Sequence, residues 1–378
     1  MAERLQDAED VLLAANEADV AAAVAGGMSP AVQDRLRLTG PLVEAMAAQL
    51  RALAGVPHEP RDRVVEERPD GLTLVERRRP VGVIGANFEA RPNVTLDIAS
   101  QLLKSRNGGV LRTGSAALRS ARALVDQVIT PALDTAGLDP DAVQLVSTED
   151  RAAAYALVSM PDLVPLVILR GSGDSTRDLG REAARHGVRT LAHADGGGVL
   201  YVGSAADERT VHALIAESLD RLGVCNRLNL LLLDRTAYDE LLPGVLGVLD
   251  RLGVEASLPP HPHPRGYEWS LDPERAATVT IDVADGPRHA ARIANEETSG
   301  LAAAVATEDE AAATEFIDAY AGSGVFWNAT TRLLDGFKLL RVPETGINID
   351  RVPGPRGPVG FRDLYLRQHV VTPSGRRA

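Results

Sequence analysis

Cysteine is the scarcest reactive residue in this chain of 378 residues, which contains only Cys225. A single thiol excludes an intramolecular disulfide framework, a cysteine zinc cage and an iron–sulfur cluster, because each of these needs several cysteines. Lysine is nearly as rare, since only Lys104 and Lys338 are present, and this leaves two candidates for Schiff-base chemistry. The positive charge is therefore carried almost entirely by arginine.

The chain also lacks the features of nucleic-acid and membrane proteins. Aromatic residues make up 3% of it, the net charge is -12 and no basic block is present, which argues against single-strand stacking surfaces and phosphate-coating binders. No apolar run reaches the roughly 18 residues that a membrane helix needs. The charged N-terminus MAERLQDAED is unlike a secretory signal. We therefore expect a cytoplasmic protein with neither a nucleic-acid nor a membrane partner.

Helical and strand-like patterns alternate over most of the chain. Residues 10–55 have apolar positions at helical spacing, and residues 57–69 are expected to form a loop. From residue 71 onward, short apolar strands are separated by helix-length segments, a pattern that predicts βαβ crossovers and parallel sheets. The first series ends with a strand at 198–202, and a second begins after Asp207. The predicted fold class is α/β with two doubly wound units.

Cys225 lies in a turn between a predicted helix that ends near Gly223 and the apolar strand NLLLLD. Free cysteine is among the most buried residue types, so one interpretation is a small apolar core residue. The other interpretation is a reactive thiol, because Gly223 permits close backbone approach and the guanidinium of Arg227 favours a thiolate. The residues alone leave both interpretations open.

The most specific motif lies between residues 80 and 115. A strand is followed by Glu89-Ala90-Arg91-Pro92-Asn93, then by a helix and by a strand that ends in Leu111-Arg112-Thr113-Gly114-Ser115. This arrangement resembles the gamma-glutamyl phosphate reductases, also called glutamate-5-semialdehyde dehydrogenases, a branch of the aldehyde dehydrogenase superfamily. Further segments along nearly the whole chain match the same family: residues 16–20 and 29–36, Arg170-Gly171-Ser172-Gly173, Gly196-Gly197-Gly198, Cys225-Asn226, Asn328-Ala329-Thr330-Thr331-Arg332 and residues 356–360.

The resemblance implies an aldehyde dehydrogenase-like fold and a role such as that in proline biosynthesis. The implied reaction is NADPH-dependent reduction of an acyl phosphate, glutamate 5-phosphate or a related activated acid, to the semialdehyde through a Cys225 thioester; NADH is the alternative cofactor. We expect a cofactor-binding domain at 1–203, with 71–80 in an oligomerisation arm. A catalytic domain at 204–341 is followed by a return to the cofactor domain and an oligomerisation tail at 342–378. The expected partners are other copies of the chain and an upstream kinase that supplies the acyl phosphate.

The chemistry of acyl phosphate reduction assigns roles to the matching residues. It needs a soft nucleophile, and Cys225 is the only one available. Asn93 and the backbone N–H of Cys225 are candidate oxyanion donors, with a helix N-cap as the alternative role of Asn93. The candidate cofactor phosphate sites are two turns that could equally be ordinary strand–helix turns: Arg112, Thr113, Gly114 and Ser115, and Arg170, Gly171, Ser172 and Gly173. The substrate-binding candidates are Glu89, Arg91, Asn226, Asn328, Thr331, Arg332 and Arg356.

Two further groups of residues have patterns that do not support a catalytic or metal-binding role. His261 and His263 lie in the proline-rich segment 257–266, where a solvated loop is the favoured interpretation, so no metal is expected. Glu268 is in the right part of the chain for a general base in aldehyde oxidation, but its sequence context does not support an assignment.

The chain departs from the family pattern in two places. Gly223-Val224 replaces the family's Ser-Thr before the cysteine, and the segment 337–347 replaces a small glycine-lined stretch, with Glu344 and Thr345-Gly346 as its remnants. Two alternatives therefore stay open. One is a family member that binds a nucleotide, a metabolite or a partner enzyme without catalysis, and the other is a reductase or dehydrogenase of a different acyl donor or aldehyde.

Overall fold

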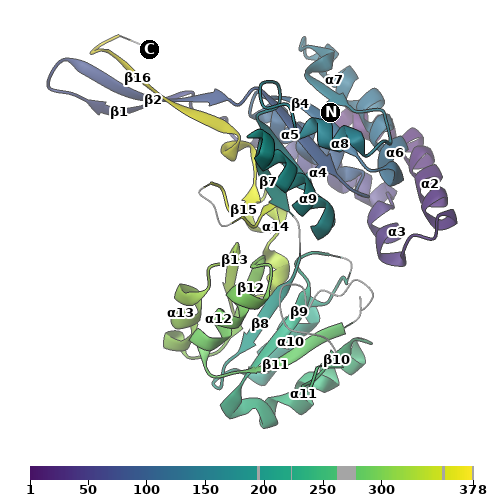
Figure 1. Ribbon diagram of the computed structural model, residues 1–378, viewed down its shortest axis with the longest axis vertical. Helices are drawn as coiled ribbons and strands as arrows, with labels where there is room; N and C mark the ends of the chain where they lie inside the picture. The colour runs from purple at the N-terminus through teal and green to yellow at the C-terminus, as the bar shows by residue number, and fades with distance from the viewer. Residues whose placement is uncertain (194–195, 223, 262–277, 351–353, 377–378) are drawn as a thin grey trace.

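The computed structural model describes residues 1–193, 196–222, 224–261, 278–350 and 354–376. A five-stranded sheet and a six-stranded sheet form two lobes, and a three-stranded arm extends from the first lobe (Figure 1). Every pairing within the two large sheets is parallel. This is the doubly wound α/β architecture that the alternating patterns predict. Within these ranges, no helix combines the length and the apolar character needed to cross a membrane.

The five-stranded sheet of the first lobe has the order β5-β4-β3-β6-β7. Its strands are β3 (Val83–Phe88), β4 (Gly108–Thr113), β5 (Val143–Leu145), β6 (Leu166–Arg170) and β7 (Arg189–His193). The helices between them are α5 (Asn93–Lys104), α6 (Leu118–Leu124), α7 (Thr130–Thr135), α8 (Ala152–Leu157) and α9 (Gly173–His186). The chain continues from β3 to β4 on one side and reaches β6 on the other. Doubly wound sheets bind ligands at such a reversal, beyond the carboxyl ends of the strands.

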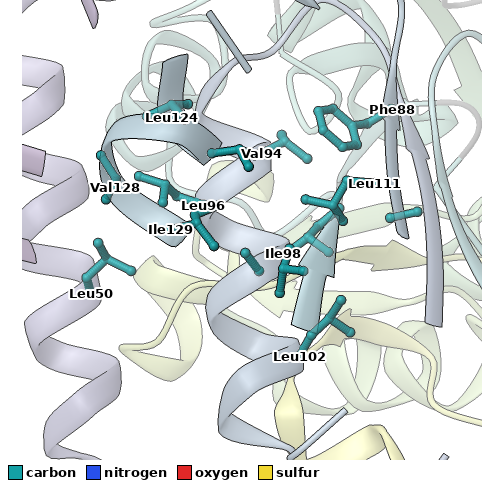
Figure 2. Close-up of a cluster of buried hydrophobic side chains, with 14 of the residues drawn as sticks. Leu50, Phe88, Val94, Leu96, Ile98, Leu102, Leu111, Leu124, Val128 and Ile129 are labelled. Atoms are coloured by element: carbon teal, nitrogen blue, oxygen red, sulfur yellow. The ribbon is translucent and has the colours of Figure 1, made fainter. Parts of the chain in front are cut away.

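Helix α5 is held in the first lobe by its apolar face. Leu96, Ile98 and Leu102 are at most 1% exposed, and they pack with side chains of β3, β4 and the helical segment after α6 (Figure 2). Burying a leucine or isoleucine side chain of this kind stabilises a fold by about 1.5–3 kcal/mol. The four N-terminal helices complete this lobe: α1 (Ala2–Asp7), α2 (Glu9–Ala25), α3 (Pro30–Leu36) and α4 (Gly40–Gly55). The packing fixes the start of α5, which directly follows the carboxyl end of β3.

The six-stranded sheet of the second lobe has the order β10-β11-β9-β8-β12-β13. Its strands are β8 (Gly198–Val202), β9 (Leu228–Asp234), β10 (Glu255–Ser257), β11 (Thr278–Ala284), β12 (Ala302–Ala306) and β13 (Gly324–Trp327). The helices are α10 (Glu208–Ser218), α11 (Tyr238–Arg251), α12 (Pro287–Glu297) and α13 (Glu310–Ala319). Along β9, Leu231 and Leu233 belong to the core on one face, and Leu230 and Leu232 to the core on the other. Burial on both faces explains the uninterrupted leucine run of this strand.

The strand at 198–202, expected to end the first series, belongs instead to the second lobe. It pairs with β9 and β12, so the change of sheet falls between β7 and β8. The reason is that a fully buried parallel strand carries no local signal for the sheet in which it pairs. The division into functional domains at residues 203 and 341 stays a prediction.

The arm also differs from expectation. Residues 57–69 were expected to form a loop, but β1 (Asp62–Glu67) pairs there with β2 (Leu72–Pro80), and β16 (Tyr365–Pro373) pairs with the other edge of β2. Almost every β1 residue is exposed, so the strand lacks the apolar alternation that marks a half-buried strand. The chain after residue 335 forms α14 (Gly336–Leu340) and the hairpin of β14 (Gly346–Asn348) and β15 (Gly357–Val359).

Candidate functional site

Cys225 lies in the turn before β9, at the amino end of the six-stranded sheet. Its carbonyl accepts the Gly197 N–H at 2.6 Å, and a Cβ built on Gly196 would lie 2.6 Å from the Cys225 Cα. The chain entering β8 can therefore pass this closely only because residue 196 has no side chain. The cysteine, itself half-buried, also packs against a small apolar cluster consisting of Leu301, Ala302, Leu334 and Ile347.

Arginines from the first lobe lie within electrostatic range of the Cys225 thiol. Burial raises the pKa of this thiol, whereas Arg91, Arg170 and Arg35 act against the increase and the Glu344 carboxylate adds to it. Arg91 follows β3 and Arg170 is the last residue of β6, so both belong to the carboxyl edge of the five-stranded sheet. That edge therefore faces the amino edge of the six-stranded sheet at Cys225. The cysteine is not an isolated core residue.

Asn93 is the first residue of α5, and the N-cap position belongs to Pro92. The alternative role of Asn93 as an N-cap is therefore not adopted. Its Nδ2 donates to Oδ2 of Asp97 at 3.0 Å, and the amide has a second hydrogen for another acceptor. The turn before α5 is sharp, because Ala90 has a φ of 45°, a conformation that costs an L-residue roughly 1–2 kcal/mol.

Two carboxyl groups near Arg170 were not among the predicted site residues. Burial raises the pKa of Asp97 to about 6 and that of Glu344 to about 7, and Arg170 acts against both increases. Glu344 also accepts the backbone N–H of Gly336. The spacing of Asn93 and Asp97, four residues apart in a predicted helix, was the signal available in the sequence for Asp97. The sequence identifies Glu344 only as a remnant of the family's stretch within the segment 337–347 and assigns no role to it.

His193 is another buried group that was not predicted from the sequence. It joins the segment 337–347, which departs from the family pattern, to the first lobe. Its Nδ1 accepts the Ile347 N–H at 3.0 Å, and Arg170 donates to the Thr345 carbonyl at 3.0 Å. Burial, with Arg170 and Arg91 nearby, holds the pKa of His193 well below its ordinary value. The imidazole is therefore neutral and serves as an acceptor for the backbone of β14.

The turn after β4 has the properties of a ligand site. The Oγ1 of Thr113 is buried without a hydrogen-bond partner in the part of the chain that the structure describes. A Cβ on Gly114 would meet no atom within 4 Å, and Ser115 begins the next helical turn. Arg112 instead anchors the strand, since it donates to Asn87 at 3.2 Å and to the Glu149 carbonyl at 3.4 Å. An unused buried hydroxyl beside open space fits a polar cofactor at this turn.

The turn after β6 is already engaged by a side chain of this chain. Oε2 of Glu89 accepts the Ser172 N–H at 3.1 Å, and a Cβ on Gly171 would lie 2.9 Å from the Glu89 carboxyl carbon. A carboxylate therefore occupies the amino end of α9, where helices favour negative charge. Glu89, predicted to bind substrate, lies at this turn, and Gly173 begins the helix.

Asn226, Thr331 and Arg332 are linked beside the cysteine. Nδ2 of Asn226 donates to the Leu334 carbonyl at 3.0 Å, and Thr331 donates to the Asn226 carbonyl at 2.8 Å. Arg332 donates to Oδ1 of Asn226 and to Asp220. These contacts hold the cysteine turn against the segment after β13.

Two other predicted substrate residues make contacts elsewhere. Asn328 follows the carboxyl end of β13 and exchanges hydrogen bonds of 3.0 and 3.1 Å with the backbone of Thr307. It therefore lies at the edge of the six-stranded sheet opposite to that of Cys225. Arg356 donates to the carbonyls of Ala321 and Ile349. Both residues have backbone partners that account for their positions.

His261 and His263, the possible metal ligands, lie in a segment that the structure describes only in part. Among the described residues, no three histidine, cysteine, aspartate or glutamate side chains are grouped to hold a metal ion. His261 is buried, not solvated as expected: its Nδ1 lies 3.2 Å from Oγ of Ser257, and its Nε2 lies 3.8 Å from Asp282. His263, Glu268 and Gly223 lie outside the described residues.

Alkylation tests the influence of the arginines on the thiol. Because burial raises the pKa of Cys225, we expect iodoacetamide to react slowly at neutral pH and faster as the pH rises. Replacing Arg91 with glutamine removes a charge that lowers this pKa and should slow alkylation at pH 8 by about three- to tenfold. Mass spectrometry of the single thiol gives the rate. Arg119→Gln, which changes an exposed arginine paired with Asp19, is the control; equal rates in both variants would exclude the influence of Arg91.

The sequence and the fold of this chain are similar to those of known proteins. Residues 34–261 match the model of the aldehyde dehydrogenase family. The structure is similar to gamma-glutamyl phosphate reductase from Thermotoga maritima, with 28% identity, a TM-score of 0.88, and coverage of 100% of this chain and 92% of that one. This confirms the resemblance predicted from the motifs.

More distant structures share the fold. An acetylating aldehyde dehydrogenase from Geobacillus thermoglucosidasius has 14% identity and a TM-score of 0.72, covering 100% of this chain and 90% of that one. An NAD-dependent aldehyde dehydrogenase from Sinorhizobium meliloti has 18% identity and a TM-score of 0.66, and the match covers 100% of this chain and 83% of that one. Since the family model matches more than half of its residues, the chain belongs to the aldehyde dehydrogenase family and is an oxidoreductase.

Proposed function

We propose that this enzyme reduces an acyl phosphate, glutamate 5-phosphate or a related activated acid, to the semialdehyde through a thioester on Cys225. The observation that carries the proposal is that the segment 345–347 joins the single thiol to the first lobe: Cys225 packs against the apolar cluster that contains Ile347, and the Thr345 carbonyl accepts a hydrogen bond from Arg170 at 3.0 Å. Arg170 and Arg91 both act to lower the pKa of this thiol. The similarity to the Thermotoga maritima reductase along the whole chain supports the choice of substrate class.

The arginines suit the first half of this reaction. The Cys225 thiol, whose pKa is raised by burial, first gives its proton to the ionised form of Glu344. The thiolate then attacks the acyl carbon, the C–O bond to phosphate breaks, and the phosphate leaves with the electron pair. Guanidinium groups stabilise both the thiolate and the departing oxyanion, because their planar donors match phosphate oxygens. Glu344, with a pKa raised to about 7 by burial, holds a proton over part of the neutral range and can supply the one that the phosphate takes up.

The second half converts the thioester to the aldehyde. A bound reduced nicotinamide supplies the hydride for this conversion. The tetrahedral oxyanion is stabilised by the second N–H of Asn93 and by the backbone N–H of Cys225. Its collapse breaks the C–S bond, releases the aldehyde and restores the thiolate.

NADPH is the proposed cofactor, held at the turn of Thr113, Gly114 and Ser115. In dinucleotide-binding sheets that use NAD, a carboxylate binds the 2′-hydroxyl of the ribose. The turn after β4 contains no acidic residue, and Arg112 precedes it. A ribose phosphate therefore meets no like charge within this turn.

Purified protein tests the function directly. It is mixed with NADPH or NADH and with acyl phosphates, acyl-CoA thioesters or aldehydes, while nicotinamide absorbance and intact protein mass are followed. We expect an acyl adduct on Cys225 from acyl phosphates and faster oxidation of NADPH than of NADH. If only acyl-CoA thioesters gave an adduct, the acyl donor would be a CoA thioester and not an acyl phosphate. The absence of an adduct from every donor would favour the non-catalytic alternative. Slow alkylation of Cys225 does not distinguish the two, because the buried thiol of an active enzyme is also expected to react slowly.

We also propose that the arm pairs with another copy of the chain. Its exposed apolar side chains are Val64, Val65, Leu366 and Val371, each between 49% and 57% exposed. Apolar residues on an arm that projects from its own lobe are suited to pairing between subunits. Light scattering of the protein and of an arm variant with these valines changed to threonine tests the association.

A further inference from the structure

Asp97 holds the side-chain amide of Asn93 in one orientation. The two residues are four positions apart in α5, and the amide nitrogen of Asn93 donates to the carboxyl group at 3.0 Å. Neighbours in the same helix, Val94, Leu96 and Ile98, are fully buried or nearly so, which keeps both side chains in register. The contact therefore depends on a rigid element and not on a loop.

The charge of Asp97 decides whether the nitrogen or the oxygen of the Asn93 amide faces its carboxyl group. Arg170, Arg91, Asp335 and Glu344 face this carboxyl, and burial raises its pKa to about 6, so it is ionised at neutral pH. An ionised carboxyl is only an acceptor. A flipped amide would place Oδ1 of Asn93 against a carboxylate oxygen, which is repulsive. Below about pH 6 the protonated carboxyl can donate instead, and the flipped amide becomes accessible.

We propose that Asp97 is a positioning residue, which keeps the second N–H of Asn93 available to the oxyanion of the reaction. The proposal rests on the proposed function, because it presumes that Asn93 is an oxyanion donor. Asp97 acts through Asn93 alone and does not contact the substrate.

The Asp97→Asn variant tests this in the full-length enzyme. An asparagine can bond either side of the Asn93 amide, so kcat should fall by about tenfold while KM changes by less than about twofold. In the Asn93→Ala background the same substitution should have no further effect on kcat, because the residue through which it acts is gone. Asp335→Asn is the matched control: it neutralises a neighbouring carboxylate that caps α14 and should leave kcat within about twofold.

Stability and pH give readouts that separate positioning from a structural role. Because the pKa of Asp97 is higher in the fold than in the unfolded chain, its ionisation destabilises the protein as pH rises from about 3.8 to about 6, and fully above that. Asp97→Asn should therefore have an equal or higher melting temperature at pH 8 despite its lower kcat. The fall in kcat of the wild type near pH 6 should be absent from the variant, while any change due to Glu344 or Cys225 remains.

The side-chain amide signal of Asn93 reports on the contact without catalysis. In protein labelled with ¹⁵N-asparagine, this signal, assigned by its loss in Asn93→Ala, should titrate near pH 6 in the wild type and not in Asp97→Asn. If the wild type is active, an equal kcat in Asp97→Asn would overturn the proposal, and so would an amide signal that does not titrate in the wild type. An inactive wild type whose amide signal titrates would contradict the proposed function but support the hold of Asp97 on Asn93.

Discussion

Replacing Cys225 with alanine is expected to lower kcat by about 10⁴-fold or more. The reason is that the chain has no second cysteine, so no other thiol can form the acyl intermediate. The fold should survive, since the side chain is small and its contacts are with the peripheral cluster of Leu301 and Leu334, not with the large cores of either lobe. We expect a loss of stability of about 1 kcal/mol from the missing sulfur. Nicotinamide oxidation, intact mass and thermal unfolding of the same preparation check the three expectations.

Cys225→Ser is the matched variant. It introduces serine, which has nearly the shape of cysteine but carries a more polar hydroxyl, a much weaker nucleophile, so no thioester can form. Its melting temperature should equal that of the wild type, and its mass should show no acyl adduct. Turnover that survived either substitution would contradict the thioester mechanism.

Replacing Asn93 with alanine is expected to lower kcat by about 10²- to 10³-fold, which corresponds to about 3–4 kcal/mol of transition-state stabilisation. The loss concerns kcat more than KM, because the oxyanion that the amide binds exists only after the carbonyl has been attacked. The helix itself should be little affected, since Asn93 does not cap it. The acyl adduct on Cys225 should form more slowly in a single-turnover mass experiment.

Asn107→Ala is the control for Asn93→Ala. Asn107 is a buried asparagine in the same lobe that accepts the Gly82 N–H and donates to the Leu364 carbonyl, both at 2.9 Å. Its removal leaves these backbone groups without partners and should cost about 1–3 kcal/mol of stability. The folded fraction should retain its kcat. If Asn107→Ala lost as much kcat as Asn93→Ala, the effect at residue 93 would be structural.

Local sequence patterns were enough to predict the elements that carry Cys225 and Asn93. The helix predicted to follow the motif that ends at Asn93, and the strand predicted after that helix, agree with α5 and β4, because an amphipathic period and an apolar run are properties of neighbouring residues. The turn that carries Cys225 was also predicted, since it separates a helical pattern from an apolar strand. By contrast, β1 was missed because its side chains are exposed, and β8 was placed in the wrong series because it is buried on both faces.

The features of the site also divide into those that local sequence predicts and those that depend on the fold. The identity of the thiol, its turn and the Asn93–Asp97 spacing follow from residues close together in the chain. The engagement of the α9 turn by Glu89 does not, because it joins residues 83 positions apart. Nor does the gathering of Arg91, Arg170 and Glu344 around Cys225, which come from separate segments of the chain.

The sequence by itself determined that a thioester can form only on Cys225, because no other thiol exists, and that the scaffold is α/β, because its periodicities are local. Only the tertiary structure decided the environment in which that thiol reacts. Folding brings guanidinium and carboxyl groups from distant segments within electrostatic range of the sulfur, and their charges, together with burial, shift its pKa and those of Asp97 and Glu344.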